Sequence, residues 1–277
     1  MKESKRPKIG LALGSGGPTG LAHIGVIKVL EENKIPIDFI AGSSIGAMIG
    51  GFYAAGLDIK KIEEIALETN WRRMFSLVDP HFKQGLIGGE KVKSFIDNYI
   101  KGKNFENCKI PFVAIATDLK TGEIVVFDKG EMTQAIRASI SIPLVFTPEE
   151  INGRLLADGG LSAPVPVEIV RGMGADIVIA VNLDKHCHDE ECKPGWYNVA
   201  NDSLSILRHH LALLNVAKAD VVVDIDVGKN YWYQFTNGQD KILVGEKATK
   251  TVLPILKELI DQKSKSNLRK YFEFFKG

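Results

Sequence analysis

Apolar residues along this chain alternate between short runs typical of buried strands and longer stretches with helical spacing. The strand-like runs cover residues 8–13, 38–42, 111–117, 123–127, 154–157, 177–183 and 220–226. The helical patterns cover residues 20–33, 45–55, 58–69, 89–100, 131–139, 196–218 and 241–262. Alternation of this kind predicts an α/β fold, with a central, mostly parallel sheet flanked by helices.

One large domain is expected to hold most of these elements. The chain has 277 residues, enough for a single α/β domain with a sizeable core, and its sequence shows no internal repeat and no low-complexity segment. We therefore expect a basic N-terminal extension over residues 1–7, one domain over 8–262 and a basic amphipathic tail over 263–277.

Composition and charge narrow the class of protein. Hydrophobic residues make up 45% of the chain and charged residues 25%, which is typical of a soluble globular protein. The formal net charge of +1 argues against a general nucleic-acid binder. No apolar run approaches the length of about 18 residues expected of a membrane span. Three cysteines give no disulfide framework, and with no signal peptide in view a cytoplasmic location is expected.

The strongest chemical signal is Gly42-Ser43-Ser44-Ile45-Gly46, a Gly-x-Ser-x-Gly motif between a strand-like run and a helix of small residues. A sharp strand-to-helix turn at such a motif exposes the middle hydroxyl at the N-terminus of the helix. The flanking glycines are needed because a Cβ there would clash with the strained backbone. Ser44 is therefore the candidate nucleophile.

A second motif follows the first strand-like run, where Gly14-Ser15-Gly16-Gly17-Pro18-Thr19-Gly20 opens a helix. Free backbone N–H groups and the helix dipole suit such a loop to a phosphate or a developing oxyanion. A dinucleotide loop would need glycine in place of Thr19, and a P-loop would need a lysine, which this loop lacks. An oxyanion hole remains, because a serine nucleophile requires one; the alternative is a βα turn without chemistry.

These motifs and two later ones resemble the patatin-like phospholipases, in particular their short bacterial members related to neuropathy target esterase. The later motifs are Ala135-Ile136-Arg137-Ala138-Ser139-Ile140-Ser141-Ile142-Pro143 and Leu156-Ala157-Asp158-Gly159-Gly160. The similarity covers most of residues 8–183. It implies a single patatin-like domain that hydrolyses fatty-acyl esters of lipids and needs no cofactor. It also implies a Ser–Asp dyad, with Ser44 as nucleophile and Asp158 as its base.

The glycine-rich loop departs from the family's usual Gly-Gly-Gly-x-Arg/Lys-Gly. Ser15 stands at the first of these glycines and Thr19 at the basic position. Pro18 has no N–H to donate, so the backbone donors of the oxyanion hole are expected at Gly16 and Gly17. We therefore expect a hole that is intact in its backbone but lacks a positive charge nearby. A weakly active or inactive binding or regulatory protein is the chief rival to an enzyme.

The base for Ser44 can be a histidine or a carboxylate. In α/β-hydrolases the histidine follows the acid along the chain. The histidines that come this late are His186, His188, His209 and His210. His23 lies inside the first helix, where it is expected to pack or to form a hydrogen bond. Asp158 ends a short apolar strand, where an α/β sheet places catalytic groups, so it is the preferred base. A Ser-His-Asp carboxylesterase of small esters is the second rival.

The strongest candidates for a metal site are His186, Cys187, His188 and Cys192. Their spacing matches no closed zinc pattern, and acidic residues are interleaved with them, which favours a solvated loop. We therefore expect no metal in this protein.

Two segments are candidates for contact with lipid. Residues 70–88 form an irregular apolar excursion that suits a lid or acyl-chain wall as well as a loop packed on the core. The tail over 263–277 mixes basic and aromatic residues, a pattern that rests on an anionic membrane or docks on its own domain. The expected partners are a phospholipid or lysophospholipid substrate and a peripheral membrane contact through the tail.

Overall fold

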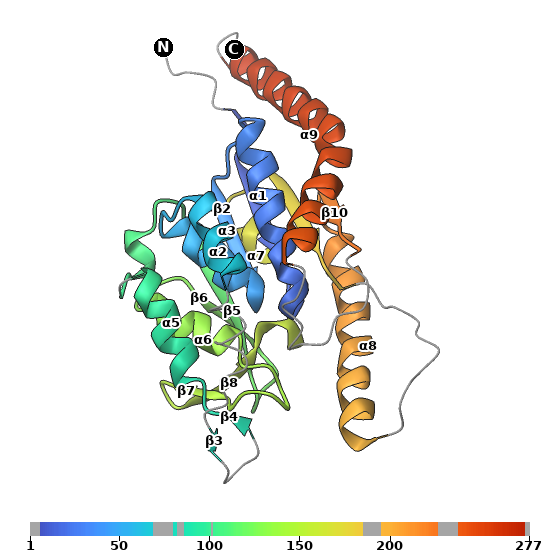
Figure 1. The fold of residues 1–277 in the computed structure, drawn as a ribbon. Helices are drawn as coiled ribbons and strands as arrows, with labels where there is room; N and C mark the ends of the chain where they lie inside the picture. The colour runs from blue at the N-terminus through green and yellow to red at the C-terminus, as the bar shows by residue number, and fades with distance from the viewer. Residues whose placement is uncertain are drawn as a thin grey trace.

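The computed structural model describes residues 6–68, 80–81, 86–100, 102–184, 195–226 and 238–274 (Figure 1). The strands are β1 (Ile9–Leu13), β2 (Phe39–Ser43), β3 (Pro80–His81), β4 (Leu86–Ile87), β5 (Phe112–Asp118), β6 (Ile124–Phe127), β7 (Glu149–Ile151), β8 (Arg154–Asp158), β9 (Ile177–Asn182) and β10 (Val221–Asp224). The α-helices are α1 (Ala22–Glu32), α2 (Ile45–Ala54), α3 (Ile59–Leu67), α5 (Glu90–Ile100), α6 (Met132–Ser139), α7 (Val167–Gly172), α8 (Trp196–Val216) and α9 (Gly238–Phe274). Short 3-10 helices are η1 (Gly17–Leu21), η2 (Phe105–Asn107) and η3 (Gly159–Leu161).

A single large sheet organises the described part of the chain. Its strand order is β10-β9-β1-β2-β5-β8-β7, and β6 also pairs with β5. The strands from β10 to β5 are parallel, whereas β6, β7 and β8 add antiparallel pairs at one side. The predicted α/β class with a mostly parallel sheet is confirmed.

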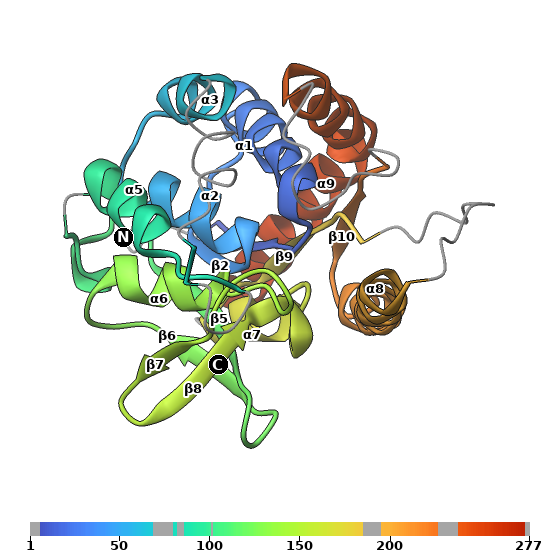
Figure 2. The same ribbon diagram turned by 60° about the horizontal axis from the view of Figure 1, so that its bottom comes forward.

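The two faces of the sheet are covered by different helices, and the residue pattern of β1 explains why. Ile9, Leu11 and Leu13 point to one face and pack with α1, α2 and α9 in the larger core. Ala12 points to the opposite face and packs in a smaller core with residues of α7 and with Ala212 of α8. In Figure 2, α1 and α2 lie on one side of the central strands and α7 lies on the other.

Strand register brings two of the predicted site residues to the same place. Ser43, at the end of β2, pairs with Ile115 of β5. The next residue of β5, Ala116, pairs with Asp158 at the end of β8. Residues that are far apart in the sequence therefore meet across β5, because Ser44 directly follows Ser43.

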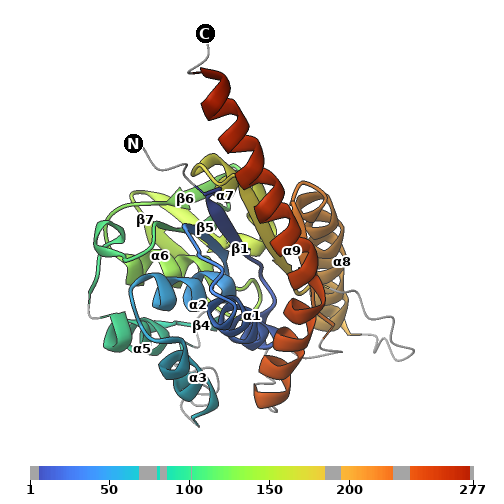
Figure 3. The same cartoon turned by 90° about the horizontal axis from the view of Figure 1, so that it is seen from above.

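The structure adds elements that the apolar pattern did not predict. These are the short strands β3, β4 and β7 and the six-residue helix α7. Helix α9 is also longer than expected, since it begins at Gly238 and continues to Phe274 through Pro254. In Figure 3 its C-terminal part projects beyond the sheet. Most of the apolar excursion at 70–88 lies outside the described residues, and the division into domain and tail stays a prediction.

Candidate active site

Ser44 stands at a sharp turn between β2 and α2. Its backbone has φ 55° and ψ −124°, a conformation with positive φ that residues other than glycine rarely adopt. The Ser44 N–H donates to Oγ of Ser139, 2.9 Å away, which fixes the turn from α6. The Ser44 hydroxyl does not cap α2. It instead donates to Oδ2 of Asp158 at 2.5 Å.

The glycines on either side of this turn are required by close packing. A Cβ at Gly42 would lie 2.5 Å from the carbonyl oxygen of Gly46, which is closer than Cβ atoms come in folded proteins. A Cβ at Gly46 would collide with the carbonyl oxygen of Leu13. The motif therefore lets α2 approach both β1 and β2, and this approach holds Ser44 beside the glycine-rich loop.

Asp158 is held by three contacts besides Ser44. Its Oδ1 accepts from the Gly160 N–H at 2.7 Å, its own N–H donates to the carbonyl of Ser141 at 3.0 Å, and its carbonyl accepts from the hydroxyl of Thr117 at 2.9 Å. Burial raises the pKa of Asp158 to about 6, although the hydrogen bonds from Ser44 and Gly160 lower it. A buried carboxylate with a raised pKa is a stronger base than an ordinary one.

The glycine-rich loop retains backbone donors at the two positions expected. The Ser15 N–H donates to Pro164 at 2.8 Å, and the Thr19 N–H donates to Gly16 at 3.3 Å. The N–H groups of Gly16 and Gly17 make no hydrogen bond with the residues that the structure describes. Gly17 has φ 55°, which turns the chain into η1. The loop therefore has two N–H groups available for an oxyanion.

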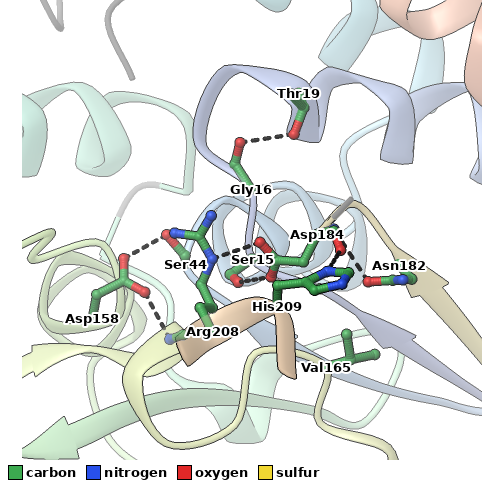
Figure 4. A network of polar contacts seen from close by, with 12 residues as sticks. Ser15, Gly16, Thr19, Ser44, Asp158, Val165, Asn182, Asp184, Arg208 and His209 are labelled. Carbon is green, nitrogen blue, oxygen red and sulfur yellow. Dashed lines mark hydrogen bonds and ion pairs between the residues drawn. The ribbon is translucent and has the colours of Figure 1, made fainter. Parts of the chain in front are cut away.

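A polar network absent from the sequence-based expectations adjoins this loop (Figure 4). Asp184, just after β9, accepts from the Ser15 hydroxyl at 3.1 Å through Oδ2. Its Oδ1 accepts from Nε of Arg208, on α8, at 2.6 Å. The charge of Arg208 offsets part of the rise that burial causes in the pKa of Asp158. The expected lack of a nearby positive charge is therefore wrong, because α8 supplies one.

A family model described as patatin-like phospholipase matches residues 11–171, which is more than half of the chain. The chain belongs to the patatin-like phospholipase family. The matched range contains the glycine-rich loop, Ser44 and Asp158 of this patatin-like domain. It ends before Asp184 and Arg208.

Curated relatives show the same relationship. An uncharacterized NTE family protein of Mycobacterium tuberculosis is 43% identical over 185 residues, which cover 66% of this chain and 51% of the relative. The human patatin-like phospholipase domain-containing protein 6 is 32% identical over 183 residues, which cover 63% of this chain and 13% of the relative. The chain thus spans about half the length of the bacterial relative and a small part of the human one.

Solved structures show the same fold at low identity. The crystal structure of VipD from Legionella pneumophila has a TM-score of 0.62 and 15% identity, over 90% of this chain and 67% of that one. ExoU of Pseudomonas aeruginosa, in its complex with SpcU, has a TM-score of 0.50 and 13% identity, over 92% of this chain and 53% of that one. These similarities support the patatin-like fold.

Two histidines among the described residues, His23 and His209, form hydrogen bonds with the backbone. His23 is fully buried, and Nε2 donates to the carbonyl of Gly14 at 2.8 Å. Burial lowers its pKa to about 4, so the ring is neutral and braces the loop. The prediction that His23 packs or forms a hydrogen bond is confirmed. His209 donates from Nδ1 to the carbonyl of Asp184 at 2.6 Å, and His186 and His188 lie outside the described residues.

Arg137 is fully buried and contacts the segment that positions Asp158. Its guanidinium donates to Ser141 at 2.6 Å and to the carbonyls of Gly88 and Thr147 at 3.1 Å each, and it lies 3.4 Å from Glu149. Because the Ser141 carbonyl accepts from the Asp158 N–H, this cluster fixes the backbone of the base. Arg137 therefore has a structural role, because it holds the segment that positions Asp158.

The described residues hold neither a metal-binding cluster nor a helix that could cross a membrane. No cluster there brings together three or more His, Cys, Asp or Glu side chains that could hold a metal ion. The candidate cluster at His186, Cys187, His188 and Cys192 lies outside those residues. None of the described helices is both long enough and apolar enough to cross a membrane.

Proposed function

We propose that this protein is a serine hydrolase that cleaves fatty-acyl esters of phospholipids or lysophospholipids. The observation that carries the proposal is the direct hydrogen bond of 2.5 Å from Ser44 Oγ to Asp158 Oδ2, formed at a strained turn in a patatin-like fold. Both side chains are buried, with relative exposures of 3% and 6%. A nucleophile and a base within hydrogen-bond reach are what acyl transfer to serine requires.

The contacts support a two-step mechanism. Asp158 accepts the proton of Ser44 as Oγ attacks the ester carbonyl carbon, and the N–H groups of Gly16 and Gly17 stabilise the oxyanion that forms. Collapse of this intermediate breaks the ester bond, and Asp158 returns the proton to the leaving alcohol. Water then attacks the acyl-Ser44 ester with Asp158 as base, which releases the fatty acid and restores the hydroxyl.

The decisive experiment is labelling of the pure protein with a fluorophosphonate probe, combined with release of fatty acid from phosphatidylcholine and lysophosphatidylcholine. We expect the label on the peptide that contains Ser44 and fatty acid from at least one lipid. A protein that takes no label and hydrolyses neither lipid would be a binding protein with this fold. Activity confined to small soluble esters would favour a carboxylesterase.

We further propose that the protein contacts the lipid surface from the periphery, through the tail over residues 263–277. Each basic side chain near an anionic surface contributes about 1 kcal/mol, and salt screens this attraction. Deleting residues 264–277 should reduce binding to anionic vesicles at low salt but spare hydrolysis of a short soluble ester. A full-length variant with Lys265, Arg269, Lys270 and Lys276 changed to glutamine is the matched control for charge. Unfolding of the truncated protein, or no vesicle binding by the intact one, would overturn the proposal.

Helix α8 offers a second surface for the same contact. Its large exposed apolar side chains are Trp196, Val199, Ile206, Leu207, Leu213 and Leu214. Helical spacing places Trp196, Val199, Leu207 and Leu214 on the side opposite to the buried Ala212, with Ile206 and Leu213 at the flank of this face. Changing Leu207 and Leu214 together to serine should therefore weaken binding to uncharged phosphatidylcholine vesicles, where the charge of the tail contributes little. Unchanged vesicle binding with a change in oligomeric state would assign this face to contact between copies of the chain.

A further inference from the structure

Helix α8 carries a fixed cation into the site from outside the range matched by the family. Arg208 is bound through Nε to Oδ1 of Asp184 at 2.6 Å. Asp184 is nearly inaccessible, with 3% of its side chain exposed, and its N–H donates to Asn182 at 3.1 Å. The same carboxylate accepts from the Ser15 hydroxyl of the glycine-rich loop. The guanidinium is thereby held in one place relative to the loop.

The ion pair with Asp184 engages only one of the three guanidinium nitrogens of Arg208. Only Nε is engaged, and within the described ranges neither Nη group of Arg208 has a hydrogen-bond partner. About a third of the side chain, 34%, is exposed. Two Nη groups present a planar set of donors that fits the oxygens of a phosphate in a bidentate manner.

The guanidinium of Arg208 lies within electrostatic range of Asp158. Burial raises the pKa of Asp158, and the positive charge of Arg208 offsets part of that rise. Burial lowers the pKa of Arg208, but the negative charge of Asp184 and, to a smaller extent, that of Asp158 raise it, so Arg208 and Asp158 interact electrostatically. In the view of Figure 4 the guanidinium lies on the Ser44 side of Asp184. A substrate group that binds Arg208 would therefore lie close to the ester that Ser44 attacks.

We propose that Arg208 is the anion-binding residue of this site and receives the phosphate of a phospholipid or lysophospholipid through its two Nη groups. The inference rests on the proposed function and specifies its substrate as an ester with a phosphate. In a glycerophospholipid the phosphate and the scissile ester are joined to the same glycerol. A cation fixed beside the nucleophile can therefore contact one while Ser44 attacks the other.

The two departures of the loop from the family motif agree with this assignment. Thr19, at the usual basic position, is neutral and donates its hydroxyl to the carbonyl of Gly16 at 2.7 Å. Ser15, in place of a glycine, provides the hydroxyl that binds Asp184. The loop thus has no cation of its own and contacts the carboxylate that holds Arg208. Because Arg208 already supplies a cation, Thr19→Arg is not expected to raise turnover.

The test compares a phosphate-bearing ester with a neutral one of equal acyl length. The probes are dioctanoylphosphatidylcholine and dioctanoylglycerol, and the readout is the ratio of their kcat/KM values. Arg208→Gln should lower this ratio about tenfold or more, the range expected when a charged hydrogen-bond donor is lost. Arg208→Lys should lower it less, because lysine keeps the charge but not the fork. Glycerol 3-phosphate should inhibit hydrolysis of the neutral ester competitively, with a higher inhibition constant in Arg208→Gln.

Arg171→Gln is the matched control. Arg171 has a similar exposure of 39% and pairs with Asp220 at 2.7 Å, away from the loop, so its loss should leave the ratio unchanged. Since Arg208→Gln alone leaves the buried Asp184 without its cation, the double variant Asp184→Asn with Arg208→Gln is prepared in parallel.

Several outcomes would overturn the assignment. Unchanged kcat/KM values for both esters in both Arg208 variants would show that no phosphate binds there. An equal loss of kcat/KM on both esters, which leaves their ratio unchanged, would place Arg208 in the chemical step instead. Failure of the proposed function would look different. Either the parent enzyme would hydrolyse neither ester, or Ser44→Ala would retain the parent's turnover of both.

Discussion

Replacing Ser44 with alanine should abolish ester hydrolysis and fluorophosphonate labelling while the fold remains intact. The change removes the oxygen that forms the acyl bond, and loss of such a nucleophile typically costs on the order of 10⁶-fold in kcat. Alanine and serine have the same difficulty with the positive φ of this turn, so the strain at φ 55° is unchanged. Turnover of phospholipid and mass spectrometry of the labelled peptide would measure the effect, with circular dichroism as the check on folding.

The neighbouring serine provides a matched control for this experiment. Ser43 is fully buried, and its hydroxyl has no hydrogen-bond partner among the described residues. Ser43→Ala should therefore retain activity and labelling, with stability equal to or slightly above that of the parent. Labelling that persists in Ser44→Ala, or that maps to Ser15 or Ser43, would show that Ser44 is not the nucleophile.

The elements that hold Ser44 and Asp158 could be predicted because each has a local signature. The strand over 38–42 runs into a turn with glycine at positions 42 and 46. The observed contacts explain these glycines, because a Cβ at either position would collide with neighbouring backbone atoms. The buried strands of the parallel sheet appear in the sequence as continuous apolar runs. Strand β7 and helix α7 are too short to give a periodic pattern, and for this reason they were missed.

Arg208 and Asp184 could not be assigned from the sequence because their meaning depends on tertiary contacts. Arg208 lies in a long helix whose other residues give an ordinary amphipathic pattern, and Asp184 follows a strand in a polar stretch. Their ion pair forms only when α8 packs beside the end of β9. A loop that lacks its expected cation is the one signal that could have prompted a search for a substitute elsewhere in the chain.

Replacing Asp158 with asparagine should lower kcat by several orders of magnitude, on the order of 10⁴-fold, because the amide cannot accept the proton of Ser44. The contact of 2.5 Å between these side chains makes a direct transfer feasible without an intervening histidine. Replacing His209 and His210 one at a time with glutamine should have little effect on turnover, and His186 and His188 serve as further controls. A comparable loss from any one histidine would favour a triad in place of the dyad.

The pH dependence of the parent enzyme should identify the same group. Burial raises the pKa of Asp158 to about 6, and only the ionised carboxylate can act as base. The value of kcat/KM should therefore be constant above about pH 7 and fall about tenfold for each unit below pH 6. A value of kcat/KM that stays constant down to pH 5 would exclude Asp158 as the titrating base.

The raised pKa of Asp158 also predicts that ionisation of this carboxylate, which catalysis requires, lowers the stability of the fold. The folded-state pKa of Asp158, about 6, is above its ordinary value of 3.8, so the folded state binds the proton more tightly than the unfolded state. Its contribution to the free energy of unfolding is therefore largest below pH 3.8 and is lost as pH rises through about 6, a difference of about 3 kcal/mol. Asp158→Asn should remove this loss, so its melting temperature should equal or exceed that of the parent at pH 8, with a smaller difference at pH 5. A variant that is inactive and less stable at pH 8 would mean that the carboxylate holds the fold together, whereas an inactive and more stable one would show that the charge is kept for catalysis.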